Sequence, residues 1–305
     1  MKLKHNKRFK RDSQRAAFLS CVGFCGYGVM RKLGNGVGCP LTGRYAYTGN
    51  LGLVMKFRKS DHIETPHGNS TVWRYMNTWK FEQLLSSGSI FFPNAVKLSD
   101  QYEVTVSNSI IEQKRKELVA KGLSGKDLEE EVGIFAWNAN PMKELVLINC
   151  WSINPHENYA LWKIYLGGEK NGVAIKSTVS KLRKSIVSGE DSYPEEFFMG
   201  KVKYRKHMSS DELSRLSVIT TKKPFYEFEK ELRLFILNYP LSEGGSVTPY
   251  DFSIGREVRV DVNELVHEIY ISPFADETYR QKIEMLLNKN KLSTDLLKQS
   301  EILDQ

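Results

Sequence analysis

Three glutamates alternate along one short segment of the chain: Glu227, Glu229 and Glu231. The apolar residues around them predict a strand from Phe228 to Leu237, which would point all three carboxylates to one face. Like charges on one strand face repel each other unless something compensates them. Arg233 lies on the same face and could pair with Glu231. The segment is therefore either an exposed, salt-bridged edge strand or the acidic part of a site.

Carboxylates in such a group favour two kinds of chemistry. They stabilise the positive charge that builds on a sugar carbon when a glycosidic bond breaks. They also bind divalent ions that activate water or polarise a phosphate, and Asp100 and Glu103 could complete such a metal site.

Other polar and aromatic residues stand at the ends of predicted elements. Arg74 closes a first strand, Ser152 closes a middle strand, and Trp162 and Tyr165 lie on the helix that follows. Each has a structural alternative. Arg74 could pair with Glu103 or Asp100, Ser152 could only cap a loop, and the two aromatic residues could be core. Cys150 lies in an apolar run, which predicts an inert core thiol.

The elements that would position these residues alternate without a regular order. The sequence predicts strands at 71–75, 145–151, 172–176, 197–204, 228–237, 258–262 and 266–271. It predicts helices at 77–85, 109–121, 128–137, 159–166, 179–187, 210–220 and 277–287. Ser124 and Asp127 predict a capping-box-like start for the third of these helices. Strands and helices mixed without a βαβ rhythm indicate an α+β fold.

The basic charge of the chain is concentrated at its start. The 305 residues carry a formal net charge of +8, but residues 1–54 account for +9 and the rest for −1. Three of the four cysteines also lie there, which leaves one in the body. No apolar run has the about 20 residues that a membrane helix needs. A nearly neutral body with one cysteine indicates a cytoplasmic protein with no membrane partner.

The first 54 residues predict no domain, because they are rich in glycine and lack periodicity. The stretch from Asn6 to Ala16 resembles a translated recombination site of the kind that flanks integron gene cassettes. The resemblance implies that Met55 is the biological start and that the preceding segment is not native. The alternative is a basic arm that binds nucleic acid or a membrane surface. Cassette arrays often carry defence and toxin genes.

Four blocks of the body resemble a bacterial family of domains of unknown function, number 2971. They lie in that family's order and together span about residues 72–287: Trp73–Tyr75 with Ile90–Asn94 and Leu98–Glu103, Cys150–Ser152 with Leu161–Ile175, Val202–Tyr204, and Lys223–Arg233. The first block departs from the family, because Ser99–Glu103 lacks the usual first Asn and the Pro. The resemblance implies one domain over residues 55–305.

The order of the same residues is similar to the Arg–Ser–Glu layout of ADP-ribosyltransferases, which cleave NAD. The resemblance implies that Arg74, with Tyr75 beside it, binds NAD, that Ser152 supports the site, and that Trp162 or Tyr165 stacks on a ring. Glu231 would stabilise the ribose cation and Glu229 would orient or deprotonate the acceptor. The acceptor of the ADP-ribose, a protein or a nucleic acid, is not indicated.

The sequence thus predicts a single α+β domain with a central, mostly antiparallel sheet, in the manner of ADP-ribosyltransferases. The predicted function is an NAD-consuming enzyme of that type, such as a phage-defence or toxin effector on a mobile cassette. One alternative is a non-catalytic binding or immunity module in which the glutamates are structural. The other is a metal-dependent nuclease.

Overall fold

The computed structural model describes residues 57–187, 196–237 and 253–302. The chain divides into two units, Met1–Asn50 and Leu51–Gln305, and all described residues belong to the second. The predictions for the first 54 residues lie outside the described residues. No helix within the described ranges has the length and apolar character to cross a membrane.

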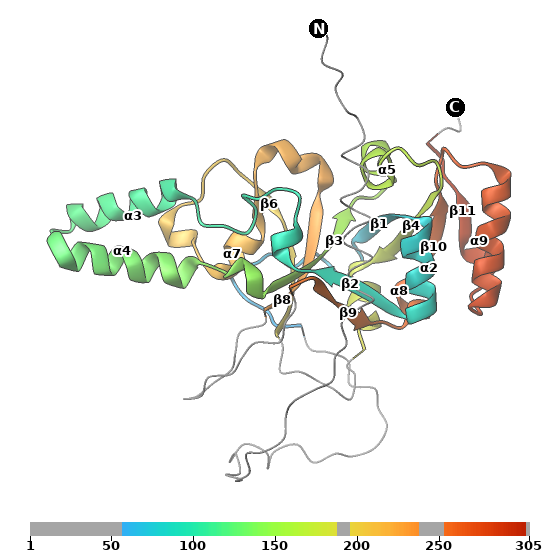
Figure 1. Ribbon diagram of the computed structural model, residues 1–305, viewed down its shortest axis with the longest axis horizontal. Helices are drawn as coiled ribbons and strands as arrows, with labels where there is room; N and C mark the ends of the chain where they lie inside the picture. Colours follow the sequence, from blue (N-terminus) through green and yellow to red (C-terminus); the bar gives the residue numbers. More distant parts are fainter. Residues whose placement is uncertain (1–56, 188–195, 238–252, 303–305) are drawn as a thin grey trace, which may run out of the picture. The chain divides into compact units, whose positions relative to one another are not determined.

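A seven-stranded sheet runs through the centre of the second unit (Figure 1). Its order is β11-β10-β4-β1-β3-β8-β5, and only the β10–β11 pair is parallel. The strands span β1 Thr71–Asn77, β3 Val146–Ile153, β4 Gly172–Thr178, β5 Glu196–Lys201, β8 Glu231–Leu237, β10 Glu268–Ile271 and β11 Leu297–Gln299. The predicted α+β class with a mostly antiparallel sheet is confirmed.

Helices and two short strand pairs surround this sheet. The helices are α2 Thr78–Ser87, α3 Asn108–Ala120, α4 Gly125–Ala139, α5 Tyr159–Leu166, α6 Val179–Ser185, α7 Arg215–Ile219, α8 Val262–Leu265 and α9 Glu277–Lys289. The short pairs are β2 Ser89–Pro93 with β9 Gly255–Arg259, and β6 Lys203–Tyr204 with β7 Thr221–Lys222. Gly88 ends α2 in the left-handed conformation, as its position in the sequence predicts.

The pleat of the strands divides the core between the two faces of the sheet. One face carries Val72, Trp151 and Leu232 and is covered by α2, α6, α9 and the β2–β9 pair. On the opposite face α5 packs against Trp73 and Tyr75, and α7 packs against Ile148 and Phe235. The sheet is therefore buried on both sides along its centre.

Strands β1 and β3 separate within the sheet. β1 pairs with β4 along its full length, from Thr71 to Asn77. With β3 it pairs only at Val72↔Ile153 and Trp73↔Ser152, while β3 continues its pairing with β8. Arg74 is the first residue of β1 beyond the last of these pairs, so it stands where the gap between the strands opens.

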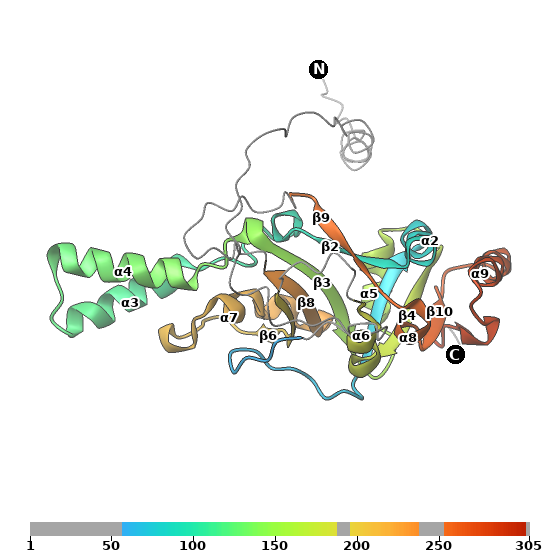
Figure 2. The same ribbon diagram turned by 90° about the horizontal axis from the view of Figure 1, so that it is seen from below.

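Helices α3 and α4 form a hairpin that extends away from the sheet (Figures 1 and 2). A small cluster of its own, centred on Leu118, Leu128 and Val132, packs the two helices together. Arg115 of α3 also forms an ion pair with Glu129 of α4. Ser124 precedes α4, but its side chain makes no capping bond, contrary to the predicted capping box.

The predicted strand over residues 228–237 is wrong at its start. Residues Pro224–Glu229 form a 3₁₀ helix, Lys230 follows with a φ of 43°, and β8 begins at Glu231. Proline fits the first turn of a helix because it has no N–H to pair there. The three alternating glutamates therefore do not share one strand face. Similarly, β9 ends at Arg259 and Val262 begins α8, so the predicted strand to 262 is too long.

Candidate functional site

Glu229 and Glu231 belong to a buried ionic network with Glu103, Lys222 and Arg233. Lys222 Nζ lies 2.9 Å from Glu103 Oε1, 2.6 Å from Glu229 Oε2 and 3.9 Å from Glu231 Oε2. Arg233 Nη2 donates to both Glu103 and Glu231. Three carboxylates therefore surround two cations, which leaves the network with a formal charge of −1.

Arg233 is fully buried, and its guanidinium is held on every side. Nε and Nη2 donate to Glu231 Oε2 at 3.0 and 2.7 Å, and Nη1 donates to the carbonyl oxygen of Ile219 at 2.7 Å. Burial alone would lower the pKa of Arg233, but the charges of Glu231 and Glu103 outweigh it and raise the pKa. The predicted Arg233–Glu231 pair is thus present, in the interior rather than at an exposed edge.

The two candidate catalytic glutamates are in different electrostatic states. Burial would raise the pKa of Glu231, but Arg233 and Lys222 outweigh it and lower the pKa. For Glu229 burial dominates and raises the pKa, although Lys222 acts in the opposite direction. The side chain of Glu231 is 8% exposed and that of Glu229 is 16% exposed. Glu229 is the more accessible carboxylate, at the end of the 3₁₀ helix.

Arg74 has a different set of partners and no carboxylate among them in the described part of the chain. Its Nη1 donates to Asn149 Oδ1 at 2.5 Å and to the carbonyl oxygen of Cys150 at 3.0 Å. The guanidinium also lies 5.8 Å from the centre of the Trp151 ring. The predicted alternative, a pair with Glu103, does not form, because Glu103 binds Lys222 and Arg233.

Asn149 positions Arg74, and sequence analysis missed it. Its Oδ1 also accepts from Trp151 Nε1 at 2.8 Å, and its Nδ2 donates to the carbonyl oxygen of Phe91 at 2.8 Å. Every polar group of this side chain is used, and the residue is 1% exposed. The sequence does contain a clue to this role. Asn149 is a single asparagine inside the apolar run 145–151, and a buried amide needs hydrogen-bond partners.

Further positive features lie around Arg74. Lys80 stands in the first turn of α2, and burial together with the charge of Arg74 lowers its pKa. Asn77 precedes α2 but makes no capping bond, and no described residue pairs with its buried Oδ1. The N-terminus of α2 carries no acidic residue in its first turn. A helix N-terminus is positive because of its free N–H groups.

Cys150 and Tyr165 connect Arg74 with the ionic network. The Cys150 side chain helps to lower the pKa of Glu231, and the carbonyl oxygen of Cys150 accepts a hydrogen bond from Arg74. Burial raises the pKa of Cys150, in agreement with the inert thiol predicted for it. Burial also raises the pKa of Tyr165, and Cys150, Glu231 and Glu229 raise it further while Arg74 lowers it. These side chains thus act on one another electrostatically.

The remaining predicted site residues are structural in their contacts. Tyr75 is 4% exposed, packs edge-on against Trp162 and accepts from the N–H of Asn158. Trp162 is 0% exposed and donates from Nε1 to Glu157. Ser152 donates to the carbonyl oxygen of Glu229 at 2.8 Å. Tyr165, which stacks on Tyr75 and is 42% exposed, is the one predicted aromatic residue with a ring open to a ligand.

The pleat of the strands places Arg74 on one face of the sheet and the predicted site residues Ser152 and Glu231 on the other. Trp73, Ser152 and Glu231 are opposite one another in register and so point to the same face. Arg74 follows Trp73 and therefore points to the other face. The register of the strands therefore does not bring Arg74 to the face that carries Ser152 and Glu231.

Hollows of about 350 and 420 Å³ occur in the described part of the molecule, and neither is lined by Arg74, Ser152 or Glu231. No three His, Cys, Asp or Glu side chains of the described residues are grouped so as to hold a metal ion. In the ionic network the cations between the carboxylates are Lys222 and Arg233.

No protein-family model, no curated protein and no solved structure matches this chain. Membership of family 2971 and the ADP-ribosyltransferase layout therefore stay predictions from the sequence.

Proposed function

We propose that this protein binds a diphosphate-containing nucleotide of the NAD class, with Arg74 as the residue that pairs with the diphosphate. The observation that carries the proposal is the state of Arg74, a partly buried cation whose described acceptors are all neutral. A guanidinium has five N–H donors in a fixed fork that matches phosphate oxygens. Arg74 uses one of its three nitrogens in the described contacts, so the others remain for an anion.

The surroundings of Arg74 support an anion rather than another carboxylate of the chain. Burying a charge without a counter-charge is unfavourable, and an incoming anion removes that penalty. Lys80 and the uncapped N-terminus of α2 add positive potential on the same side. Tyr165, which stacks on Tyr75 on the opposite face of the sheet, offers a partly exposed ring to a base or to nicotinamide.

A panel of adenine ligands tests which part of the nucleotide is recognised. We expect NAD and ADP-ribose to raise the thermal unfolding midpoint of the full chain, because a ligand that binds only the folded state stabilises it. Adenosine, which lacks the diphosphate, should leave the midpoint unchanged at the same concentration. Equal shifts with all three ligands would mean that Arg74 does not read a diphosphate, and no shift with any of them would remove the proposal.

An NAD-consuming, ADP-ribosyltransferase-like reaction is the second candidate, and Glu229 is the residue that favours it. Its carboxylate is the more exposed of the pair, and its raised pKa suits a group that takes up a proton from an acceptor. Glu231 is already bound by Arg233 and Lys222. In this proposal Glu229 therefore keeps the proton-accepting role that the resemblance gives it, while Glu231 is held by the cations of the network.

Release of nicotinamide from NAD by the full chain separates the catalytic from the non-catalytic reading. In the catalytic reading Glu229→Gln abolishes release, while Glu227→Gln on the exposed side of the same 3₁₀ helix leaves it unchanged. Binding of NAD without any release would identify a non-catalytic binding module. That reading has its own support, because the glutamates of the network have structural partners.

A further inference from the structure

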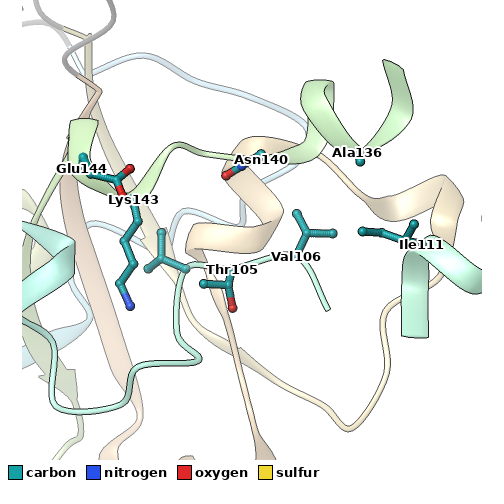
Figure 3. Close-up of a pocket in the computed structure, with 8 residues that line it drawn as sticks. Thr105, Val106, Ile111, Ala136, Asn140, Lys143 and Glu144 are labelled. Carbon is teal, nitrogen blue, oxygen red and sulfur yellow. The ribbon is translucent and has the colours of Figure 1, made fainter. Parts of the chain in front are cut away.

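The base of the α3–α4 hairpin holds a hollow of about 350 Å³ (Figure 3). It is lined by Val104, Thr105, Val106, Ile111, Ala136, Asn140, Lys143 and Glu144. These residues come from the loop before α3, from both helices of the hairpin and from the turn before β3. The volume lies in the range of about 300–1,000 Å³ that is common for small-molecule sites.

One side of this hollow is aliphatic. Val106 and Ile111 point toward each other across it, and Ala136 lies near them on α4 (Figure 3). All three are partly buried, so their apolar surface is not fully covered by the chain itself. A ligand with a short aliphatic group would cover this surface and gain from its removal from water.

The other side carries two opposite charges that the chain leaves largely unused. Lys143 Nζ donates to the carbonyl oxygen of Gln101 at 3.2 Å, which leaves two of its three N–H donors. The Glu144 carboxylate makes no hydrogen bond or ion pair among the described residues. The backbone oxygen of Glu144 accepts a hydrogen bond from Asn94. A cation and an anion therefore border one aliphatic hollow without pairing with each other.

The backbone beside the hollow is strained at two positions. Val104 has a φ of 59° and Met142 a φ of 50°, and both are left-handed conformations that side chains with a Cβ rarely adopt. For the β-branched Val104 this is a marked outlier. Such residues persist where the surrounding structure imposes them, which is common at ligand sites.

We propose that this hollow binds a free α-amino acid with an aliphatic side chain. Its carboxylate would pair with Lys143, its ammonium with Glu144, and its side chain would pack against Val106, Ile111 and Ala136. Both charges of the ligand and its apolar part then meet a complementary group. The site is separate from Arg74 and does not depend on NAD, so its test can fail without affecting the function proposed above.

Three ligands of matched shape test the charge pairing by titration calorimetry on the full chain. The first is L-leucine, the second is 4-methylpentanoate, which lacks the ammonium, and the third is 3-methylbutylamine, which lacks the carboxylate. We expect L-leucine to bind and each truncated ligand to bind at least tenfold more weakly. Failure of L-leucine, L-isoleucine and L-valine to bind at millimolar concentration would overturn the proposal, as would equal affinity for the truncated ligands.

Variants locate the binding. Lys143→Met and Glu144→Gln should each weaken the affinity for L-leucine at least tenfold, and Ala136→Phe should abolish it by filling the aliphatic side. Lys126→Met and Glu130→Gln are matched changes on exposed positions of α4 that do not line the hollow, and should have no effect. Each variant is checked for an unchanged circular dichroism spectrum. Unchanged affinity in all three folded cavity variants would place any binding elsewhere and overturn the proposal.

Discussion

At the scale of single residues, burial decides which of the candidate side chains are free for chemistry. Glu231 was a reasonable candidate, because nothing in its own segment except Arg233 could neutralise it. Lys222, on β7, reaches it in the fold, and Glu103, from the loop before α3, binds both Lys222 and Arg233. The Glu231–Arg233 pair was predictable, since residues two apart on a strand share a face. The partners distant in sequence were not, because no local pattern encodes them.

Removal of Glu231 is expected to destabilise the protein rather than only alter a reaction. In Glu231→Ala the buried guanidinium of Arg233 loses its main partner, and breaking a buried ion pair costs about 3–5 kcal/mol. Glu64→Ala is the control, because Glu64 lies 3.6 Å from Lys201 with both side chains about half exposed, and such pairs contribute about 1 kcal/mol or less. Urea unfolding gives the free energy of unfolding of both variants. An equal loss of stability in Glu231→Ala and Glu64→Ala would argue against a structural role of the network.

The network also predicts a pH dependence of stability. The pKa of Glu231 is lowered in the folded state, so its stabilising contribution is present above the ordinary pKa of about 4.3 in the unfolded chain. The contribution is lost as the pH falls through the lower, folded-state pKa. The difference in free energy of unfolding between the wild type and Glu231→Gln should therefore be constant at neutral pH and shrink below about pH 4. A difference that grows on acidification would contradict the assignment.

At the scale of elements, the sequence predicted a helix or strand correctly where its pattern fitted only one kind of element. Helix α5 has the predicted bounds, and α2 ends at Ser87, close to the predicted end at 85. The segment from Pro224 to Glu229 fits both a strand and a 3₁₀ helix, and there the proline and Lys230 in a left-handed conformation decide for the helix. The separation of β1 from β3 was not predictable, because it depends on pairing between distant strands.

Close approach of two strands and a helix at Gly172 gives a prediction for a glycine. A Cβ at this position would meet the carbonyl oxygen of Met76 at 2.7 Å and also Cδ2 of Leu166. Gly172→Ala should therefore lower the free energy of unfolding by about 1–3 kcal/mol through overpacking. Gly133→Ala on α4 meets no atom within 4 Å, and should raise it by about 0.5–1 kcal/mol, because alanine favours the helix. If denaturant titrations show that both substitutions change the free energy of unfolding in the same direction, this packing is contradicted.

At the scale of the whole molecule, the arrangement of the sheet determines what the candidate residues can do together. The mixture of strands and helices predicted the α+β class, but the strand order and the assignment of each residue to a face require the fold. Arg74 lies on one face and Glu231 on the other, and Tyr165 stacks on Tyr75 on the face of Glu231. In the proposed function Arg74 would bind the anion, and the carboxylate would come from Glu229, at the end of the 3₁₀ helix before β8.

The affinity of the full chain for NAD, measured by calorimetry with Arg74→Gln beside the wild type, tests this account most directly. Loss of a charge-assisted hydrogen bond is worth about 1.5–3 kcal/mol, so Arg74→Gln should weaken NAD binding about 10- to 100-fold. Arg280→Gln removes an arginine that pairs with Glu284 on α9 and should leave the affinity unchanged. If Arg74→Gln binds NAD as tightly as the wild type does, or if the wild type does not bind NAD, the assignment of Arg74 is contradicted.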